Sequence, residues 1–284
     1  MDNTMATCDG VNAPFLQKRF NTLIEVVPPD GSNPDRLLSK LSNLSGLSFE
    51  GFSVATNPVA KPRMSAMALC ALIQQTIRKP AILHCTTRDH NRLSLQSLLW
   101  GAIALNIKTV LAATGDMVAL GDRAITTHVK DATVFELISM ARKDGLFAGA
   151  VFDPHPGAIS LTAAVRQLQK KADAGAQFAV SQPVYDEKTA DEIITATKDI
   201  DIPIIMGILP LRTARHAEFL HHKVAGIAVP KNLRQRMAKA KDPAIEGVAN
   251  ARELLTMAKE RFYGACIMPP FDHYEILFDL LQDD

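Results

Sequence analysis

The sequence predicts an α/β protein with a single-domain (β/α)8 barrel of the TIM type. Eight short apolar runs, several rich in β-branched residues, alternate with longer segments whose apolar residues recur at helical spacing. The chain has 284 residues, which suits one barrel domain. An open doubly wound sheet is the alternative. Neither a G-x-G-x-x-G nor a G-x-x-x-x-G-K-[ST] phosphate-binding pattern is present, so the closed barrel is favoured.

The predicted strands are short apolar runs bounded by turn-forming or polar residues, as expected of buried parallel strands. The fourth ends at Gly115, where the chain can turn sharply without a steric penalty from a Cβ atom. In chain order the strands are Thr22–Val27, Phe49–Ala55, Ala81–Thr86, Thr109–Ala113, Phe147–Phe152, Gln177–Ser181, Pro203–Leu209 and Gly264–Met268.

The segments between the strands are amphipathic, and several begin near Pro, Ser or Asp, which favour helix starts. The predicted helices are Asp35–Leu44, Met64–Arg78, Arg92–Leu105, Ala132–Lys143, Leu161–Ala174, Glu187–Lys198 and Ile245–Arg261. The apolar run Val224–Pro230 is interpreted as part of an excursion before the eighth strand. His221-His222 and the basic stretch Lys231–Lys241 are interpreted as solvated helix or loop without a functional role.

Residues 1–20 are predicted to be an N-terminal extension and residues 21–284 the barrel domain. The first twenty residues match neither a signal peptide nor a membrane span, so we expect a soluble cytoplasmic protein. Lys and Arg number 31 against 30 Asp and Glu, giving a net charge of +1. Such balance predicts a small-molecule ligand, with no nucleic acid and no membrane as partner. We also expect a homo-oligomer.

The four cysteines are far apart, and no C-x-x-C pair occurs. This spacing predicts neither a zinc ribbon nor an iron–sulfur cluster. We therefore expect reduced thiols and no bound metal.

Polar residues lie near or just after the C-terminal ends of several predicted strands, at the barrel face that carries the active site in this architecture. They are Glu25, Thr56-Asn57, His84 with Thr86, Asp116, Asp153 with His155, and Ser181-Gln182. Asp116 directly follows Gly115 and is predicted to lie at the barrel mouth, although a strand-ending Asp can instead cap the next helix.

Glu25 lies inside an apolar run, where an unpaired carboxylate is costly. Either it has a structural partner or its protonation is used, and the sequence favours neither alternative. With a raised pKa, Glu25 could act as a general acid near neutral pH. His84 is interpreted as a hydrogen-bonding residue at the mouth, because no second ligand stands beside it at metal-binding spacing.

Two basic groups have competing interpretations. The cluster Arg88–Arg92 could clamp a substrate, or it could be a solvated loop in which Asp89 or Asn91 caps the next helix. Lys170-Lys171 could meet a phosphate or form a solvated helix face.

Several stretches in shared order and spacing resemble the methylenetetrahydrofolate reductase family over most of the chain. They are Ile24–Pro29, His84–Arg92, Leu111–Asp116, His155-Pro156, Lys170–Ala176 with Ser181-Gln182 and Asp186, and Gly207–Pro210. Asn57–Ser65 and Met268–Phe271 resemble the branch found alone or fused to methyltransferase domains in bacteria. The resemblance implies a flavin-bearing barrel in which hydride passes between FAD and the one-carbon unit of tetrahydrofolate.

By this resemblance Glu25 is the general acid that opens the methylene bridge. Asp116 contacts the pterin and tunes the flavin, and Gln182 binds the pterin. The residues implied around the flavin and its phosphates are His84, Thr114, Gly115, Asp116, His155 and Lys171. FMN is an alternative to FAD, because Val151-Phe152 stands where some members have Tyr. The implied electron donor is NAD(P)H, another reduced carrier or a donor protein.

Two rival functions remain open at the level of the sequence. One is a folate-binding subunit without tightly bound flavin, acting within a methyl-transfer or electron-transfer complex. The other is a lyase or aldolase barrel. The latter is disfavoured, because no lysine ends a predicted strand where it could form a Schiff base.

Overall fold

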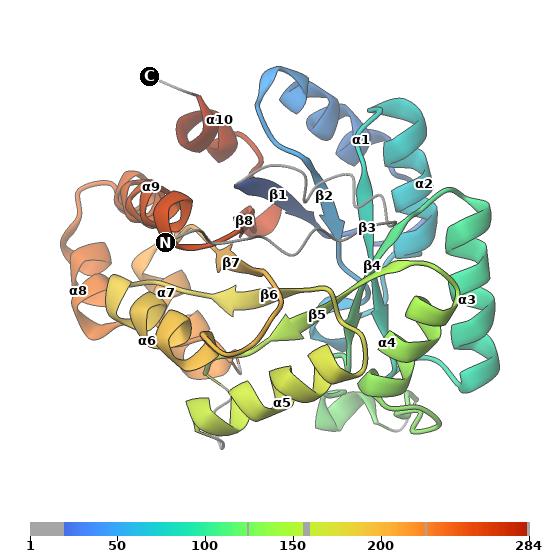
Figure 1. Ribbon diagram of the computed structural model, residues 1–284. Coiled ribbons are helices and arrows are strands. Elements are labelled where there is room, and N and C mark those ends of the chain that lie inside the picture. The colour runs from blue at the N-terminus through green and yellow to red at the C-terminus, as the bar shows by residue number, and fades with distance from the viewer. Residues whose placement is uncertain (1–19, 124, 156–159, 225, 283–284) are drawn as a thin grey trace.

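Eight parallel strands close into a barrel with helices around it (Figure 1). The computed structural model describes residues 20–123, 125–155, 160–224 and 226–282. Each strand pairs with the next along the chain, and β8 pairs with β1. The prediction of a TIM-type barrel is therefore confirmed. Except for residue 20, the predicted N-terminal extension lies outside the described residues.

All eight predicted strands overlap an observed one, and three have the observed bounds: β3, β4 and β5. The strands are β1 (Asn21–Val26), β2 (Gly51–Val54), β3 (Ala81–Thr86), β4 (Thr109–Ala113), β5 (Phe147–Phe152), β6 (Phe178–Pro183), β7 (Ile204–Ile208) and β8 (Gly264–Ile267). Their parallel order brings all their C-terminal ends to one face of the barrel.

Most of the helices begin at a side chain that accepts a backbone N–H, and these caps include Ser65, Asn91, Thr133, Ser160 and Asp186. The helices are α1 (Asp35–Ser42), α2 (Ala66–Thr76), α3 (Arg92–Ala104), α4 (Val134–Lys143), α5 (Leu161–Asp173), α6 (Glu187–Thr197), α7 (Ala214–Lys223), α8 (Lys231–Lys239), α9 (Pro243–Arg261) and α10 (Ile276–Leu281).

The excursion before β8 contains α7 and α8, where the sequence left helix and loop as alternatives around His221 and Lys231. Residues 224 and 226–230 between them form no strand, in keeping with the interpretation of this run as part of an excursion. The two helices are held by a small apolar cluster that includes Leu220, Leu233 and Met237. The basic stretch that begins at Lys231 is thus a helix with one buried side.

Apolar side chains fill both the space inside the barrel and the layer between strands and helices. Inside the barrel, Phe147 and Phe178 stack with their ring centroids 5.4 Å apart. Gly149 makes room for this stack, since a Cβ atom there would lie 2.2 Å from the Phe178 ring. The barrel centre is therefore packed, and ligands have access only to its ends.

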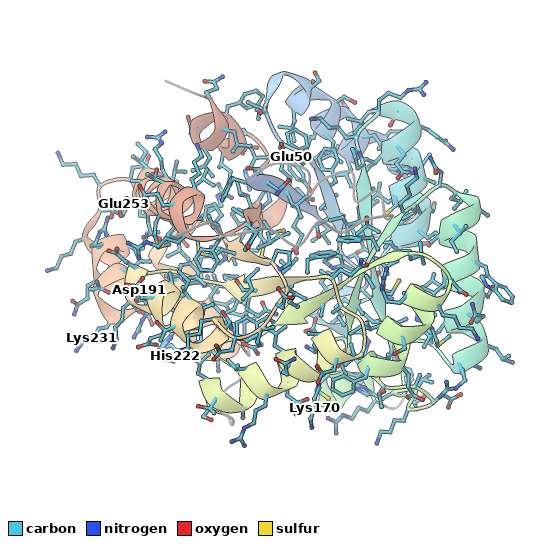
Figure 2. All side chains as sticks on the ribbon, in the orientation of Figure 1. Glu50, Lys170, Asp191, His222, Lys231 and Glu253 are labelled. Atoms are coloured by element: carbon cyan, nitrogen blue, oxygen red, sulfur yellow. The ribbon has the colours of Figure 1, made fainter. Side chains whose placement is uncertain are left out.

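Charged side chains lie on the outer faces of α5, α6, α8 and α9. Figure 2 shows Lys170, Asp191, Lys231 and Glu253 projecting from the outer helices. Among the described residues, no helix is both long and apolar enough to cross a membrane.

Candidate active site

Glu25 lies near the end of β1 and pairs in register with Ser53 of β2. Its carboxyl group has no hydrogen-bond or ion-pair partner within the described part of the chain. Burial, and secondarily the negative charge of Asp116, raise the pKa of Glu25 to about 7. Of the two alternatives left open for Glu25, a structural partner is therefore not observed, and the carboxyl group is balanced between its two protonation states at neutral pH.

His84 faces Ser53 across two neighbouring strands. Its Nε2 lies 2.7 Å from the Ser53 hydroxyl, and the Thr56 hydroxyl donates to the His84 carbonyl at 2.5 Å. Burial lowers the pKa of His84 to about 4, so the imidazole is neutral at pH 7. His84 thus serves as a neutral hydrogen-bonding group. Among the described residues, no cluster of three or more His, Cys, Asp or Glu is arranged to hold a metal.

Asp116 follows β4 through Thr114 and Gly115, whose φ of +89° disfavours any residue with a side chain. The Asp116 carboxylate accepts the backbone N–H of Val59 at 2.5 Å. The next α-helix, α4, is capped by Thr133. The helix-capping alternative for Asp116 is therefore wrong, and its carboxylate lies between the loops that follow β2 and β4.

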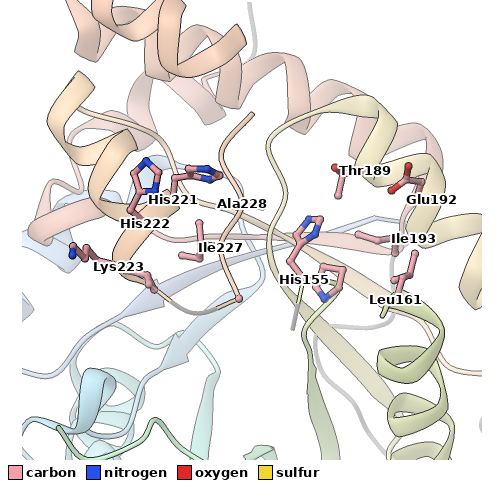
Figure 3. A pocket seen from close by; sticks show the side chains of 13 residues that line it. His155, Leu161, Thr189, Glu192, Ile193, His221, His222, Lys223, Ile227 and Ala228 are labelled. Carbon is pink, nitrogen blue, oxygen red and sulfur yellow. The ribbon is translucent and has the colours of Figure 1, made fainter. Parts of the chain in front are cut away.

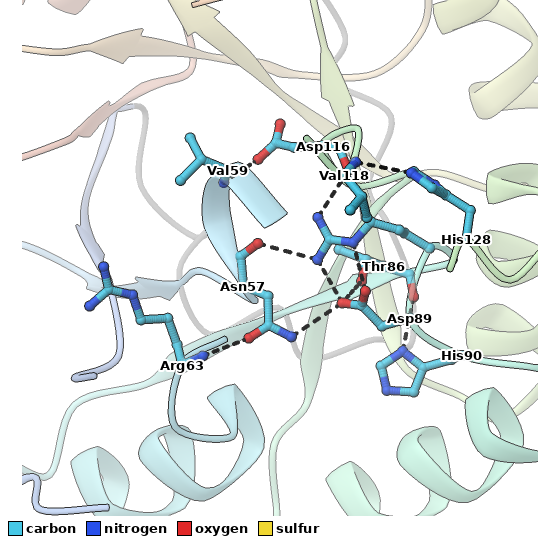
Figure 4. A network of polar contacts seen from close by, with 10 residues as sticks. Asn57, Val59, Arg63, Thr86, Asp89, His90, Asp116, Val118 and His128 are labelled. Atoms are coloured by element: carbon cyan, nitrogen blue, oxygen red, sulfur yellow. Dashed lines mark hydrogen bonds and ion pairs between the residues drawn. The ribbon is translucent and has the colours of Figure 1, made fainter. Parts of the chain in front are cut away.

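The Arg88–Arg92 cluster divides into two parts. Asn91 caps α3 by accepting the N–H of Ser94 at 2.9 Å, as one interpretation predicted. Arg88 is instead buried and forms an ion pair with Asp89 (Figure 4). Asp89 is therefore a partner of Arg88 and does not cap the helix.

Lys171 and His155 lie near the end of β5, together with Asp153. The Lys171 ammonium donates to the Val151 carbonyl at 2.6 Å, and Asp153 accepts the backbone N–H of His155 at 2.9 Å. Burial lowers the pKa of Lys171, an effect that the Asp153 charge opposes. Its neighbour Lys170 is exposed on α5. The pair thus splits into one lysine held at the end of β5 and one solvated lysine.

Gln182 lies in β6, where the strand is irregular. The pairing of β6 with β7 shifts between Val180 and Pro183, and the Ser181 hydroxyl accepts the N–H of Gly207 at 2.9 Å. This side-chain contact replaces part of the regular ladder and leaves Gln182 partly exposed.

A cleft of about 720 Å³ lies beside the end of β5 (Figure 3). Its walls come from the β5 end, the start of α5, α6, the last turn of α7 and the residues after it. They include His155, Thr189, His221 and Ile227. Glu25, Asp116 and Gln182 do not line it. The predicted residues therefore form one group around the ends of β1 to β4 and another near β5, with Gln182 on β6.

Sequence reasoning missed Ser53 and Val59. Ser53 lies in a predicted strand at the position that pairs with Glu25, and this register was the available signal. Val59 contributes only a backbone N–H, for which no side-chain pattern gives a signal.

The family model for methylenetetrahydrofolate reductase matches residues 11–265 of this chain. The chain belongs to the methylenetetrahydrofolate reductase family. Among curated members, the 5,10-methylenetetrahydrofolate reductase of Pectobacterium carotovorum is 28% identical over an alignment of 204 residues. The match covers 69% of this chain and 66%, just under two thirds, of that enzyme. A probable methylenetetrahydrofolate reductase (NADPH) from Caenorhabditis elegans is 29% identical over an alignment of 140 residues. The match covers 46% of this chain and 20% of the nematode protein.

Solved structures agree on the fold. An uncharacterized Clostridium thermocellum protein, described as binding two copies of 5-methyl-5,6,7,8-tetrahydrofolic acid, has a TM-score of 0.67 at 15% identity and covers 94% of this chain and 96% of its own. A 2,3-dimethylmalate lyase has a TM-score of 0.54 at 14% identity, covering 93% and 80%. At these identities the likeness concerns the barrel alone.

Proposed function

We propose that the protein is a flavin-dependent reductase that interconverts 5,10-methylenetetrahydrofolate and 5-methyltetrahydrofolate by hydride transfer. The observation that carries this proposal is the Glu25 carboxyl group: among the described residues it has no hydrogen-bond or ion-pair partner, and burial and Asp116 raise its pKa to about 7. The names of the curated family members support the reaction. The folate ligand of the Clostridium thermocellum protein supports the substrate class.

Glu25 acts as the general acid. Because its pKa is raised to about 7, the carboxyl group can still carry a proton near neutral pH and give it to the folate N10 as the methylene bridge opens. In the reverse direction the same carboxylate takes that proton back. The physiological direction therefore does not change the role of Glu25.

Asp116 and Gln182 hold the pterin in this proposal. Asp116 follows β4 and Gln182 lies near the C-terminal end of β6, so both are at the face formed by the strand C-termini. Asp116 can accept hydrogen bonds from the N–H groups of the pterin, and the Gln182 amide can both donate and accept.

The chemistry of the donor set fits a flavin. Lys171 offers an ammonium and His155 an imidazole for phosphate oxygens, while His84, Thr114 and Gly115 lie at the ends of β3 and β4. FAD, or FMN in its place, supplies the two-electron hydride chemistry when bound. The negative charge of Asp116 would disfavour the anionic form of the reduced flavin. The reductant is NAD(P)H or another reduced carrier, and we expect a cytoplasmic homo-oligomer.

The test is an anaerobic visible spectrum of the purified protein, as isolated and after saturation with FAD, followed by 5-methyltetrahydrofolate. We expect a flavin band near ~450 nm that bleaches as methylenetetrahydrofolate forms. A colourless protein that binds 5-methyltetrahydrofolate and never bleaches would contradict the reductase and support the rival folate-binding subunit.

A further inference from the structure

We propose that Arg88 is the positioning residue for Asp116: its guanidinium holds the loops after β2 and β4 together and so fixes the Asp116 carboxylate at the barrel mouth. The role of Asp116 in catalysis rests on the proposed function, whereas its placement by Arg88 does not. Figure 4 shows the network that connects the two loops.

The orientation of Arg88 is locked by Asp89. Arg88 is only 3% exposed, and its Nε and Nη2 donate to the two carboxylate oxygens of Asp89, each at 2.6 Å. Asp89 is fixed in turn, because it also accepts the Thr86 hydroxyl and the Asn57 amide, both at 3.2 Å. A planar guanidinium paired in this two-point way cannot rotate without losing both bonds.

The remaining contacts of the guanidinium reach one carbonyl in each loop. Nη1 donates to the Asp116 carbonyl at 3.1 Å, and Nη2 donates to the Asn57 carbonyl at 3.2 Å. These two bonds and the two to Asp89 use four of the five N–H donors that a guanidinium possesses. Little donor capacity is left for an anionic substrate, so the geometry argues against Arg88 as the substrate clamp.

The β2 loop held by Arg88 has an unfavourable backbone. Asn57, Val59 and Ala60 have φ values of 42°, 50° and 55°, and this left-handed region is especially costly for β-branched Val. Such a conformation persists only where its surroundings impose it. Here the imposed turn aims the Val59 N–H at the Asp116 carboxylate, 2.5 Å away. Asp116 is thereby held at both its carbonyl and its carboxylate.

Arg88→Lys tests this assignment, since a lysine keeps the charge but cannot hold Asp89 at two points and reach both carbonyls. The readout is hydrogen exchange of the Val59 amide by NMR, which requires neither flavin nor substrate. We expect its protection to fall about tenfold or more in Arg88→Lys. Arg92→Lys is the matched control, because Arg92 forms an exposed ion pair with Glu136. This variant should leave the protection of the Val59 amide against exchange unchanged.

The catalytic consequence is tested by a double-mutant cycle on the 5-methyltetrahydrofolate half-reaction. If Arg88 acts through Asp116, Arg88→Lys combined with Asp116→Ala should be no slower than Asp116→Ala alone. Fully additive losses, or unchanged Val59 protection in Arg88→Lys, would overturn the assignment. Should Arg88→Lys not fold, Asp89→Asn loosens the same guanidinium and must show the same loss of Val59 protection. If the wild-type protein does not react with folate, the proposed function is wrong. The hydrogen exchange of the Val59 amide then still decides whether Arg88 positions Asp116.

Discussion

The Nε2 of His84 lies 2.7 Å from the Ser53 hydroxyl, and Ser53 is also the strand neighbour of Glu25. Two titratable groups thus lie on either side of one serine, and burial favours the neutral form of each. It lowers the pKa of His84 to about 4 and, together with Asp116, raises that of Glu25 to about 7. Their contributions to stability consequently change with pH in opposite directions.

Glu25→Gln should be increasingly stabilising relative to the wild type as the pH rises from 4.5 to 7. The raised pKa means that Glu25 binds its proton more tightly in the folded protein than in the unfolded chain. The stability that this proton contributes is therefore fully present below pH 4.5 and is lost as the pH rises through 7. The difference should reach about 3 kcal/mol at pH 7, because each pKa unit between 4.5 and about 7 corresponds to about 1.4 kcal/mol. Urea unfolding between pH 4 and 8 measures it. His84→Gln should show the opposite trend and become more stable relative to the wild type as the pH falls from 6.5 to 4. If the stability difference from the wild type does not change with pH for either variant, the two pKa shifts are wrong.

The same Glu25→Gln variant should keep its flavin and remain reducible, yet slow the folate half-reaction by about 100-fold or more, because a glutamine amide donates no proton. Stopped-flow absorbance separates the two half-reactions. Asp30→Asn, an exposed acidic residue in the loop after β1, is the matched control and should react like the wild type. Full folate turnover in Glu25→Gln would remove Glu25 from the role of general acid.

Asp116→Asn should move the pH dependence of the folate half-reaction to lower pH. The Asp116 charge helps to raise the pKa of Glu25, so neutralising it lowers that pKa. Reduction of methylenetetrahydrofolate needs protonated Glu25 and should decline above pH ~7 in the wild type, but from a lower pH in the variant. Rates measured from pH 5.5 to 9 check this, and coincident profiles would place Asp116 too far from Glu25 to act on it.

Lys171→Met should weaken flavin binding by about tenfold or more, since one charge-assisted hydrogen bond to a phosphate is lost. Lys170→Met is the matched control on the same helix, because Lys170 is exposed and should not contribute. Titration of the apoprotein with FAD, followed by flavin fluorescence, gives both dissociation constants. If the two variants bind FAD with equal affinity, Lys171 does not bind the flavin and only stabilises the end of β5.

Gly115→Ala should destabilise the fold by about 1–3 kcal/mol. The φ of +89° disfavours alanine, and a Cβ atom would lie 3.0 Å from the Arg88 Cβ atom. Gly121→Ala is the control from the same loop, with no atom within 4 Å of its Cβ position and no positive φ. Denaturant midpoints compare the two, and equal midpoints would show that the loop after β4 adapts to a side chain.

The barrel could be predicted because each strand and each long helix has enough buried apolar residues to be recognised from its own sequence. The sequence was less informative where the structure of one element is determined by its contacts with another. In α8, only Leu233 and Met237 are buried, so the pattern of an otherwise basic helix was too sparse to assign. The β6 strand extends to Pro183 because the Ser181 hydroxyl supports an irregular pairing that no local pattern encodes.

The site divides in the same way. Glu25 and Asp116 were identifiable, because a carboxylate in an apolar strand or after a strand-ending glycine is conspicuous. Arg88 was identified as a member of a polar cluster, but its bonds run to two carbonyls, and carbonyl positions depend on loop geometry and not on residue type. The split between Lys170 and Lys171 likewise follows from the rotation of α5 against β5, which the sequence does not specify.

The Phe178 ring fills the space inside the barrel that a side chain at position 149 would need. Neither position can change freely on its own: a side chain at 149 would collide with the ring, and a smaller residue at 178 would leave a void. The two positions should therefore evolve as a pair. Across an alignment of related barrels, we expect bulk at one position to be matched by smallness at the other, a covariation that would arise from packing alone and carry no information about the substrate.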